Sequence, residues 1–161
     1  MVYLYSGEIQ TGKSTSLYNL IQTHPGRTGG FVTPTLRDGK KYIVNCKTQE
    51  IHPFELEPDS GILGISIGRY LLSPESFDSA ELWTKDQLNT HNVIIIDELG
   101  KLELKDKGFH DLFSGILLDQ KPDQIIIAVV RKSLVADITE KYCLDNALIF
   151  EHPHDLTSIF R

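Results

Sequence analysis

A short apolar segment near the N-terminus, Val2 to Tyr5, runs directly into a loop bracketed by two glycines. The loop reads Gly7-Glu8-Ile9-Gln10-Thr11-Gly12-Lys13-Ser14 and matches the pattern G-x-x-x-x-G-K-[ST]. In that pattern the glycines let the backbone wrap closely, so that successive N–H groups point at phosphate oxygens. The spacing of Leu17, Leu20 and Ile21 predicts a helix over residues 13–23. A strand before the loop and a helix after it are the context that a phosphate-binding loop requires.

Two residues of this loop have expected chemical roles. Lys13 would reach the β- and γ-phosphates of a nucleotide, and the Ser14 hydroxyl would hold Mg²⁺. The alternative is a Gly-Lys-Ser turn that matches the pattern by chance.

An acidic pair follows the segment Val93 to Ile96, which is apolar at every position, as in a parallel strand covered on both faces. Asp97 would lie at the carboxyl end of that strand, where α/β sheets place ligands, and is expected to bind Mg²⁺. Glu98 could take a proton from an attacking water and orient it. The alternatives are a turn-capping Asp97 and a surface Glu98.

A second all-apolar segment, Ile125 to Val130, is expected to lie between the phosphate-loop strand and the Asp97 strand. The reason is that Glu98 directly follows Asp97, and P-loop proteins with such an adjacent Glu resemble the division that has an intervening strand. Arg131 follows it and would point toward the γ-phosphate, where a positive charge could stabilise the transition state. Arg37 and Lys101 compete for that role, and a solvated turn is the alternative for Arg131.

The remaining patterns predict one α/β domain over residues 1–161, a three-layer P-loop NTPase sandwich with a mostly parallel central sheet. An inserted β-hairpin region is expected near residues 41–46 and 51–56, with residues 61–68 as a further extended piece. Helices are expected over residues 74–88, 109–117 and 134–142, and Asp155 is expected to cap a short terminal helix. The alternating charges of Lys101, Glu103 and Lys105 favour a solvated surface.

Charge and composition restrict the partners. The net charge of −6 argues against nucleic acid and anionic membranes, which both attract positive surfaces. The apolar runs are far shorter than the ~20 residues that span a bilayer. Cys46 and Cys143 form no CxxC pair and, with no apolar signal segment, favour a reducing cytoplasm. A monomer is the expectation, although the sequence carries no signal for oligomeric state.

Four stretches together resemble the THEP1-like nucleoside-triphosphatase family: GEIQTGKST (7–15), GFVTPTLRDG (30–39), IGRY (67–70) and IIDELGKLEL (95–104). The resemblance implies slow, Mg²⁺-dependent hydrolysis of several nucleoside triphosphates by a RecA-like domain. It assigns phosphate binding to the loop extended by Thr15, Mg²⁺ to Ser14 and Asp97, and water activation to Glu98. The family loop is usually richer in glycine and carries proline, whereas Glu8 to Thr11 stand here.

Two other functions use the same residues. A small-molecule or nucleotide kinase would use Lys13, Ser14 and Asp97 to transfer phosphate to a bound hydroxyl, and such enzymes usually carry an arginine-rich lid, which the sequence lacks. A nucleotide-dependent switch would use slow hydrolysis as a timer for binding a protein or RNA partner. The preferred base and the physiological partner are not encoded in any recognisable pattern.

Overall fold

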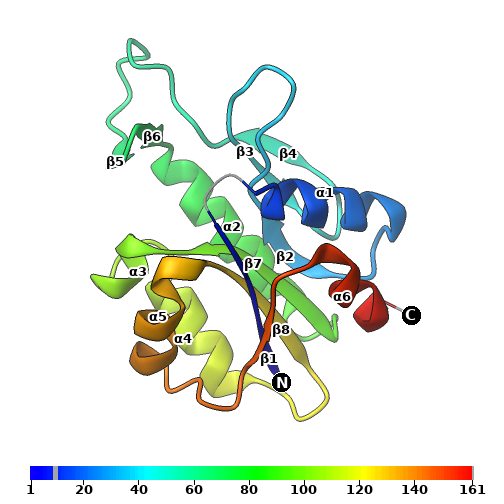
Figure 1. Cartoon of the computed structure of the whole chain (residues 1–161). Coiled ribbons are helices and arrows are strands. Elements are labelled where there is room, and N and C mark those ends of the chain that lie inside the picture. The colour runs from blue at the N-terminus through cyan, green and yellow to red at the C-terminus, as the bar shows by residue number, and fades with distance from the viewer. Residues whose placement is uncertain (9–10, 161) are drawn as a thin grey trace.

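The computed structural model describes residues 1–8 and 11–160 (Figure 1). The strands are β1 (Val2–Gly7), β2 (Gly29–Val32), β3 (Tyr42–Asn45), β4 (Ile51–Pro53), β5 (Ile65–Ile67), β6 (Tyr70–Leu72), β7 (Val93–Leu99), β8 (Ile125–Arg131) and β9 (Leu148–Phe150). The helices are α1 (Lys13–Thr23), α2 (Pro74–Gln87), α3 (Lys101–Leu104), α4 (His110–Asp119), α5 (Val135–Lys141) and α6 (Pro153–Thr157), with 3₁₀ turns η1 (Lys132–Leu134) and η2 (Ser158–Phe160).

Within the described residues, seven strands form one sheet in the order β4-β3-β2-β7-β8-β1-β9. In this order, the strands β2, β7, β8, β1 and β9 each pair in parallel with the next, and β3 and β4 add an antiparallel edge beside β2. β8 pairs with both β1 and β7, so the prediction of an intervening strand is confirmed. This order brings the carboxyl ends of the phosphate-loop strand, the Arg131 strand and the Asp97 strand to the same edge of the sheet.

Helices cover both faces of the sheet, which confirms the predicted three-layer α/β sandwich (Figure 1). On one face, α2, α4 and α5 pack over a cluster that includes Ile94, Ile96 and Phe113. On the other face, α1 and α6 pack over a cluster that includes Ile95 and Leu17. Successive residues of β7 therefore enter opposite layers, which explains why the strand is apolar throughout.

The expected insertion lies between β2 and α2. It contains the antiparallel pair β3 and β4 and a separate hairpin of β5 and β6. Only residues 65–67 of the expected 61–68 extension are a strand. The insertion reaches over the end of the sheet at which β1 ends (Figure 1), so it can supply side chains to the phosphate loop.

Two local predictions differ from the structure. Asp155 lies inside α6, because His152 is the residue before the helix and Pro153 occupies the first helical turn, where its fixed φ is favoured. The charged run after Gly100 forms α3, and Glu103 is buried rather than solvated.

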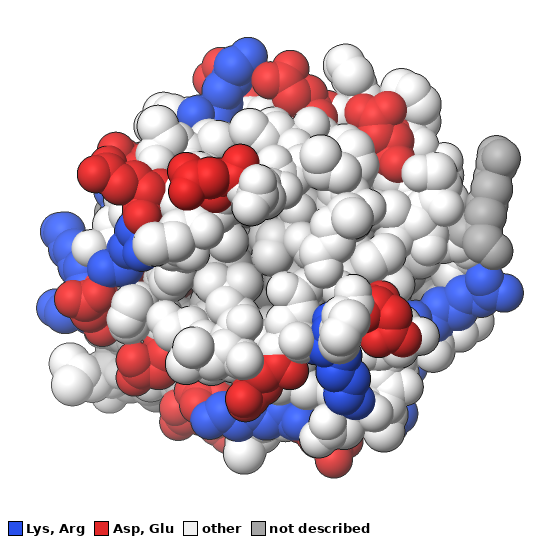
Figure 2. Space-filling model, turned by 90° about the horizontal axis from the view of Figure 1, so that it is seen from below, with Lys and Arg blue, Asp and Glu red and all other residues white. Residues whose placement is uncertain are grey.

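Charged side chains of both signs alternate around the face where β1 begins, and Figure 2 shows no continuous positive patch among the described residues of that face. Cys46 is buried and Cys143 is exposed after α5, and both are free thiols. No helix among the described residues combines the length and the apolar character needed to cross a membrane.

Candidate active site

The phosphate loop connects β1 to α1 through Gly12, which has φ 78° and so adopts a backbone conformation that favours glycine. Lys13 begins α1 and curls back over the loop. Its Nζ donates to the carbonyl oxygens of Gly7 at 3.2 Å and Glu8 at 2.7 Å, and to Thr11 Oγ1 at 3.4 Å. Ile9 and Gln10, also predicted to bind phosphate, lie outside the described residues.

Lys13 is 8% exposed, and burial is the main reason that the pKa of its ammonium group is lowered. Glu98 and Asp97 act in the opposite direction, and Arg131 adds to the lowering. The charged residues predicted from three separate motifs are therefore near enough to influence one another. A buried lysine favours an anionic ligand, because the negative charge of the ligand stabilises the protonated ammonium group.

Asp97 is completely buried at the end of the regular part of β7. Its Oδ2 accepts a hydrogen bond from the Thr33 backbone N–H at 2.8 Å, whereas Oδ1 has no partner among the described residues. Burial raises the Asp97 pKa, with Glu98 as the next cause, while the Thr33 N–H, the nearby Ser14 hydroxyl and Lys41 lower it. A buried carboxylate with an unused oxygen needs a cation or a donor.

The residues around Asp97 fit Mg²⁺. The free Oδ1 and the neighbouring Ser14 hydroxyl are oxygen ligands, which this hard cation prefers. The described residues contain no group of three or more His, Cys, Asp or Glu side chains that could hold a metal alone. That agrees with Mg²⁺ bound by one or two protein oxygens together with water and substrate phosphates.

Glu98 and Arg131 form an ion pair between neighbouring strands. Arg131 Nε donates to Glu98 Oε1 at 3.0 Å, and the side chains are 31% and 28% exposed. The register of β7 against β8 shifts between Ile96 and Leu99, so the acidic pair lies in an interruption of the ladder. Such irregularities re-aim side chains, and here both carboxylates lie near enough to Lys13 to act on its pKa.

A pocket of about 510 Å³ joins these groups, and its walls include Lys13, Ser14, Glu98 and Arg131. Lys101 also lines it, whereas the third competitor, Arg37, is exposed on a turn and does not. The pocket thus brings residues 11–15 of the phosphate loop together with Glu98 and Arg131 at the carboxyl ends of β7 and β8.

Sequence reasoning missed two basic residues at this pocket, Lys41 and Arg69. Both come from the insertion, and both lie near the ring of Tyr70, at 5.3 Å and 5.0 Å from its centroid. Single basic residues in an insertion carry no motif, so the sequence had no signal for them beyond the resemblance at residues 67–70.

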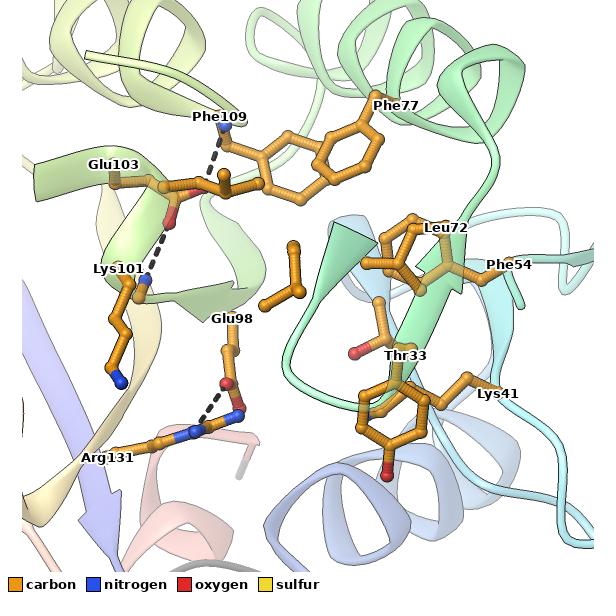
Figure 3. A pocket seen from close by; sticks show the side chains of 14 residues that line it. Thr33, Lys41, Phe54, Leu72, Phe77, Glu98, Lys101, Glu103, Phe109 and Arg131 are labelled. Atoms are coloured by element: carbon orange, nitrogen blue, oxygen red, sulfur yellow. Dashed lines mark hydrogen bonds and ion pairs between the residues drawn. The ribbon is translucent and has the colours of Figure 1, made fainter. Parts of the chain in front are cut away.

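A second, mostly apolar cavity of about 80 Å³ (Figure 3) adjoins the phosphate pocket and shares Glu98 with it. Phe54, Leu72, Phe77 and Phe109 line its inner side, and the polar part of its wall consists of Thr33, Lys41, Tyr70, Glu98, Lys101, Glu103 and Arg131.

Glu103, which is 3% exposed, fixes one wall of this cavity. Its Oε1 accepts from the Phe109 N–H at 2.8 Å and its Oε2 from the Gly100 N–H at 2.6 Å. The spacing of Gly100 and Glu103 was the available signal, because a glutamate three residues after a helix cap often bonds back to that cap.

The comparisons with known proteins identify a family. The family model described as NTPase matches residues 2–150. The nucleoside-triphosphatase THEP1 of Methanocaldococcus jannaschii is 28% identical over 120 residues, which cover 71% of this chain and 67% of that protein. THEP1 of Thermotoga maritima is 24% identical over 159 residues, covering 94% and 86%.

Solved structures share the fold. The crystal structure of THEP1 from Aquifex aeolicus has a TM-score of 0.70 at 24% identity and covers 99% of this chain and 95% of its own. A human cancer-related nucleoside triphosphatase, solved in solution, has a TM-score of 0.66 at 22% identity, with coverage of 98% and 94%. Since the family model spans nearly the whole chain, including both acidic and phosphate-loop motifs, the protein belongs to this NTPase family.

Proposed function

We propose that this nucleoside triphosphatase acts as a monomer that hydrolyses ATP, GTP and other nucleoside triphosphates to the diphosphate and phosphate, with Mg²⁺ as cofactor. One observation carries the proposal: Lys13, Ser14, Glu98 and Arg131 line a single pocket, with the buried Asp97 beside it.

The phosphate loop binds the triphosphate. Backbone N–H groups at the start of α1 and the Lys13 ammonium face the β- and γ-phosphate oxygens, and the positive end of the α1 dipole adds to the attraction. Phosphate oxygens would replace the carbonyl oxygens of Gly7 and Glu8 as acceptors for Lys13 Nζ. This exchange keeps the buried ammonium paired throughout binding.

Asp97 and Ser14 would hold Mg²⁺, which neutralises charge on the β- and γ-phosphates when bound. Thr33 keeps Asp97 oriented through its backbone N–H, so the free Oδ1 stays fixed. This hydrogen bond connects the metal site at the end of β7 to Thr33, the residue that follows β2.

Glu98 orients the attacking water and accepts its proton, because its carboxylate reaches the phosphate pocket from the end of β7. Arg131 holds Glu98 through Nε, while its Nη groups make no hydrogen bond within the described residues. Those donors remain able to bind phosphoryl oxygens as charge spreads over them in the transition state. The ion pair thus joins the proton acceptor to the charge-stabilising group.

The substitution Glu98→Gln tests this assignment. It keeps the size of the side chain but removes its basicity, so turnover at saturating Mg²⁺-ATP should fall about 10²- to 10⁴-fold. The dissociation constant for Mg²⁺-ATP should change little, because the phosphate contacts of Lys13 remain. Phosphate release and equilibrium nucleotide binding measure the two quantities.

Glu140→Gln is the matched control, since Glu140 is exposed on α5 away from the pocket. It should retain wild-type turnover. A Glu98→Gln protein that keeps more than about a third of wild-type turnover contradicts the role of Glu98, given the size expected of a general base. Turnover that persists in EDTA contradicts the Mg²⁺ requirement.

A further inference from the structure

We propose that the apolar cavity beside Glu98 binds a small primary alcohol with an apolar body, and that the protein transfers the terminal phosphoryl group of the nucleotide to its hydroxyl. The proposal goes beyond hydrolysis and rests on the same nucleotide site.

Rigid aromatic packing shapes the cavity. The rings of Phe54 and Phe77 lie 5.1 Å apart, and those of Phe77 and Phe109 lie 4.7 Å apart. Phe77 lies on α2, Phe109 directly before α4, and Phe54 directly after β4. Because the three rings pack against one another, they do not move in to fill the cavity. The volume of about 80 Å³ is roughly half that of an engineered apolar cavity known to bind benzene. An apolar group smaller than a benzene ring, such as a short branched chain, fits.

The interior offers little to a polar ligand. Glu103 lies in the wall, but its two carboxylate oxygens already accept the Gly100 and Phe109 N–H groups. The other polar side chains of the cavity wall also line the phosphate pocket: Thr33, Lys41, Tyr70, Glu98, Lys101 and Arg131 (Figure 3). A ligand with an apolar body and one polar end would therefore place that polar end beside Glu98.

This placement sets up phosphoryl transfer. The hydroxyl oxygen attacks the γ-phosphorus and forms a new P–O bond, while the bond from the γ-phosphorus to the β–γ bridging oxygen breaks. Glu98 accepts the hydroxyl proton, and the nucleoside diphosphate leaves with the bridging oxygen. The products are a phosphate monoester, the diphosphate and one proton. An alcohol in the cavity also keeps water from the same position, so hydrolysis falls as the ester forms.

The experiment offers the wild-type protein Mg²⁺-ATP with 2-methylpropan-1-ol or 3-methylbutan-1-ol, and with glycerol as a polar alcohol. Phosphorus NMR separates the phosphate ester from inorganic phosphate. The two apolar alcohols should give ester in a saturable manner, and glycerol should give inorganic phosphate alone, because burying its extra hydroxyls in an apolar cavity is unfavourable.

A pair of variants tests the cavity itself. Leu102→Phe adds bulk to a wall residue, so the ratio of ester to inorganic phosphate should fall about tenfold or more, as for a pocket that loses room for a methylene or two. Leu118→Phe adds the same ring at a position 86% exposed on α4 and should keep the wild-type ratio.

The outcomes separate the two proposals. Inorganic phosphate without ester from either apolar alcohol overturns the acceptor site and leaves the hydrolase intact. Ester with equal ratios in wild type and Leu102→Phe also overturns the cavity as the acceptor site. Loss of both products in the wild-type protein contradicts the proposed function itself.

Discussion

Asp97 places a carboxylate inside the molecule with one oxygen that has no hydrogen-bond donor among the described residues. Its pKa in the folded protein is raised above the ordinary 3.8. A carboxyl group with a raised folded-state pKa favours folding while it is protonated, and that contribution is lost as the pH rises through the raised pKa. At neutral pH the charge that would bind Mg²⁺ therefore opposes folding of the metal-free protein.

We expect Asp97→Asn to stabilise the metal-free protein at pH 7 by about 1 kcal/mol, which is the lower end for a buried unsatisfied group. For a chain of this size that raises Tm by roughly 2–4 °C. The gain should disappear at pH values below the ordinary aspartate pKa, because the wild-type carboxyl group is then protonated. Urea denaturation in EDTA across this pH range measures it.

The same variant should lose Mg²⁺-dependent turnover, since an amide is a poor ligand compared with a carboxylate. Asp123→Asn, at an exposed position before β8, is the control and should change neither property. Equal pH dependence of stability in Asp97→Asn and wild type would show that the buried charge is not the cause.

At the scale of single elements, α3 is a helix of four residues that owes its position to one side chain. Glu103 accepts backbone N–H groups from both ends of the segment, Gly100 and Phe109. Its burial raises its pKa, and the two N–H donors oppose that shift without cancelling it. The segment between β7 and α4 is thus fastened by a buried carboxylate rather than by apolar contacts alone.

Glu103→Ala should lower the free energy of unfolding by about 1–3 kcal/mol, because it leaves buried N–H groups without acceptors. Glu103→Gln should have a smaller effect, since its amide oxygen can still accept one of the two bonds. Guanidinium denaturation measures both, with Glu140→Ala as the exposed control. A Glu103→Ala protein as stable as this control would refute the fastening role.

The elements themselves were largely predictable. Helical periodicity located α1 and α4, and unbroken apolar runs located β7 and β8, because each pattern reflects burial on one face or on two. The Ser73 cap followed by Pro74 located α2. Glu103 was not predicted, since alternating charges usually indicate solvent, and only tertiary packing buries this one. The prediction that Asp155 caps the terminal helix was wrong, because α6 begins at Pro153, two residues before Asp155.

At the scale of the whole molecule, the site depends on strand order. β8 separates β1 from β7, so Arg131 lies between the phosphate loop and the acidic pair. The sequence predicted this order from the adjacency of Asp97 and Glu98. The apolar cavity was beyond prediction, because Phe54, Phe77 and Phe109 come from segments of the chain that only the folded sheet brings together.

Nucleotide binding should therefore stabilise the whole domain. At a Mg²⁺-ATP concentration 100 times its dissociation constant, linkage adds about 2.7 kcal/mol. That corresponds to a rise in Tm of roughly 5–11 °C. Calorimetry should show this rise for wild type and its near absence for Lys13→Ala, which loses the cation of the phosphate loop. Lys47→Ala, exposed on the turn after β3, should behave like wild type. An equal rise in Lys13→Ala would place nucleotide binding elsewhere.

The two cysteines divide sharply between the interior and the surface. Cys46 is fully buried, and burial raises the pKa of its thiol, whereas Cys143 is exposed. A maleimide dye added to the native protein should thus attach once per chain, at a defined point that needs no engineering. The rate at which a second dye attaches to Cys46, followed by intact-protein mass spectrometry, would then report how readily the chain just after β3 becomes exposed to solvent.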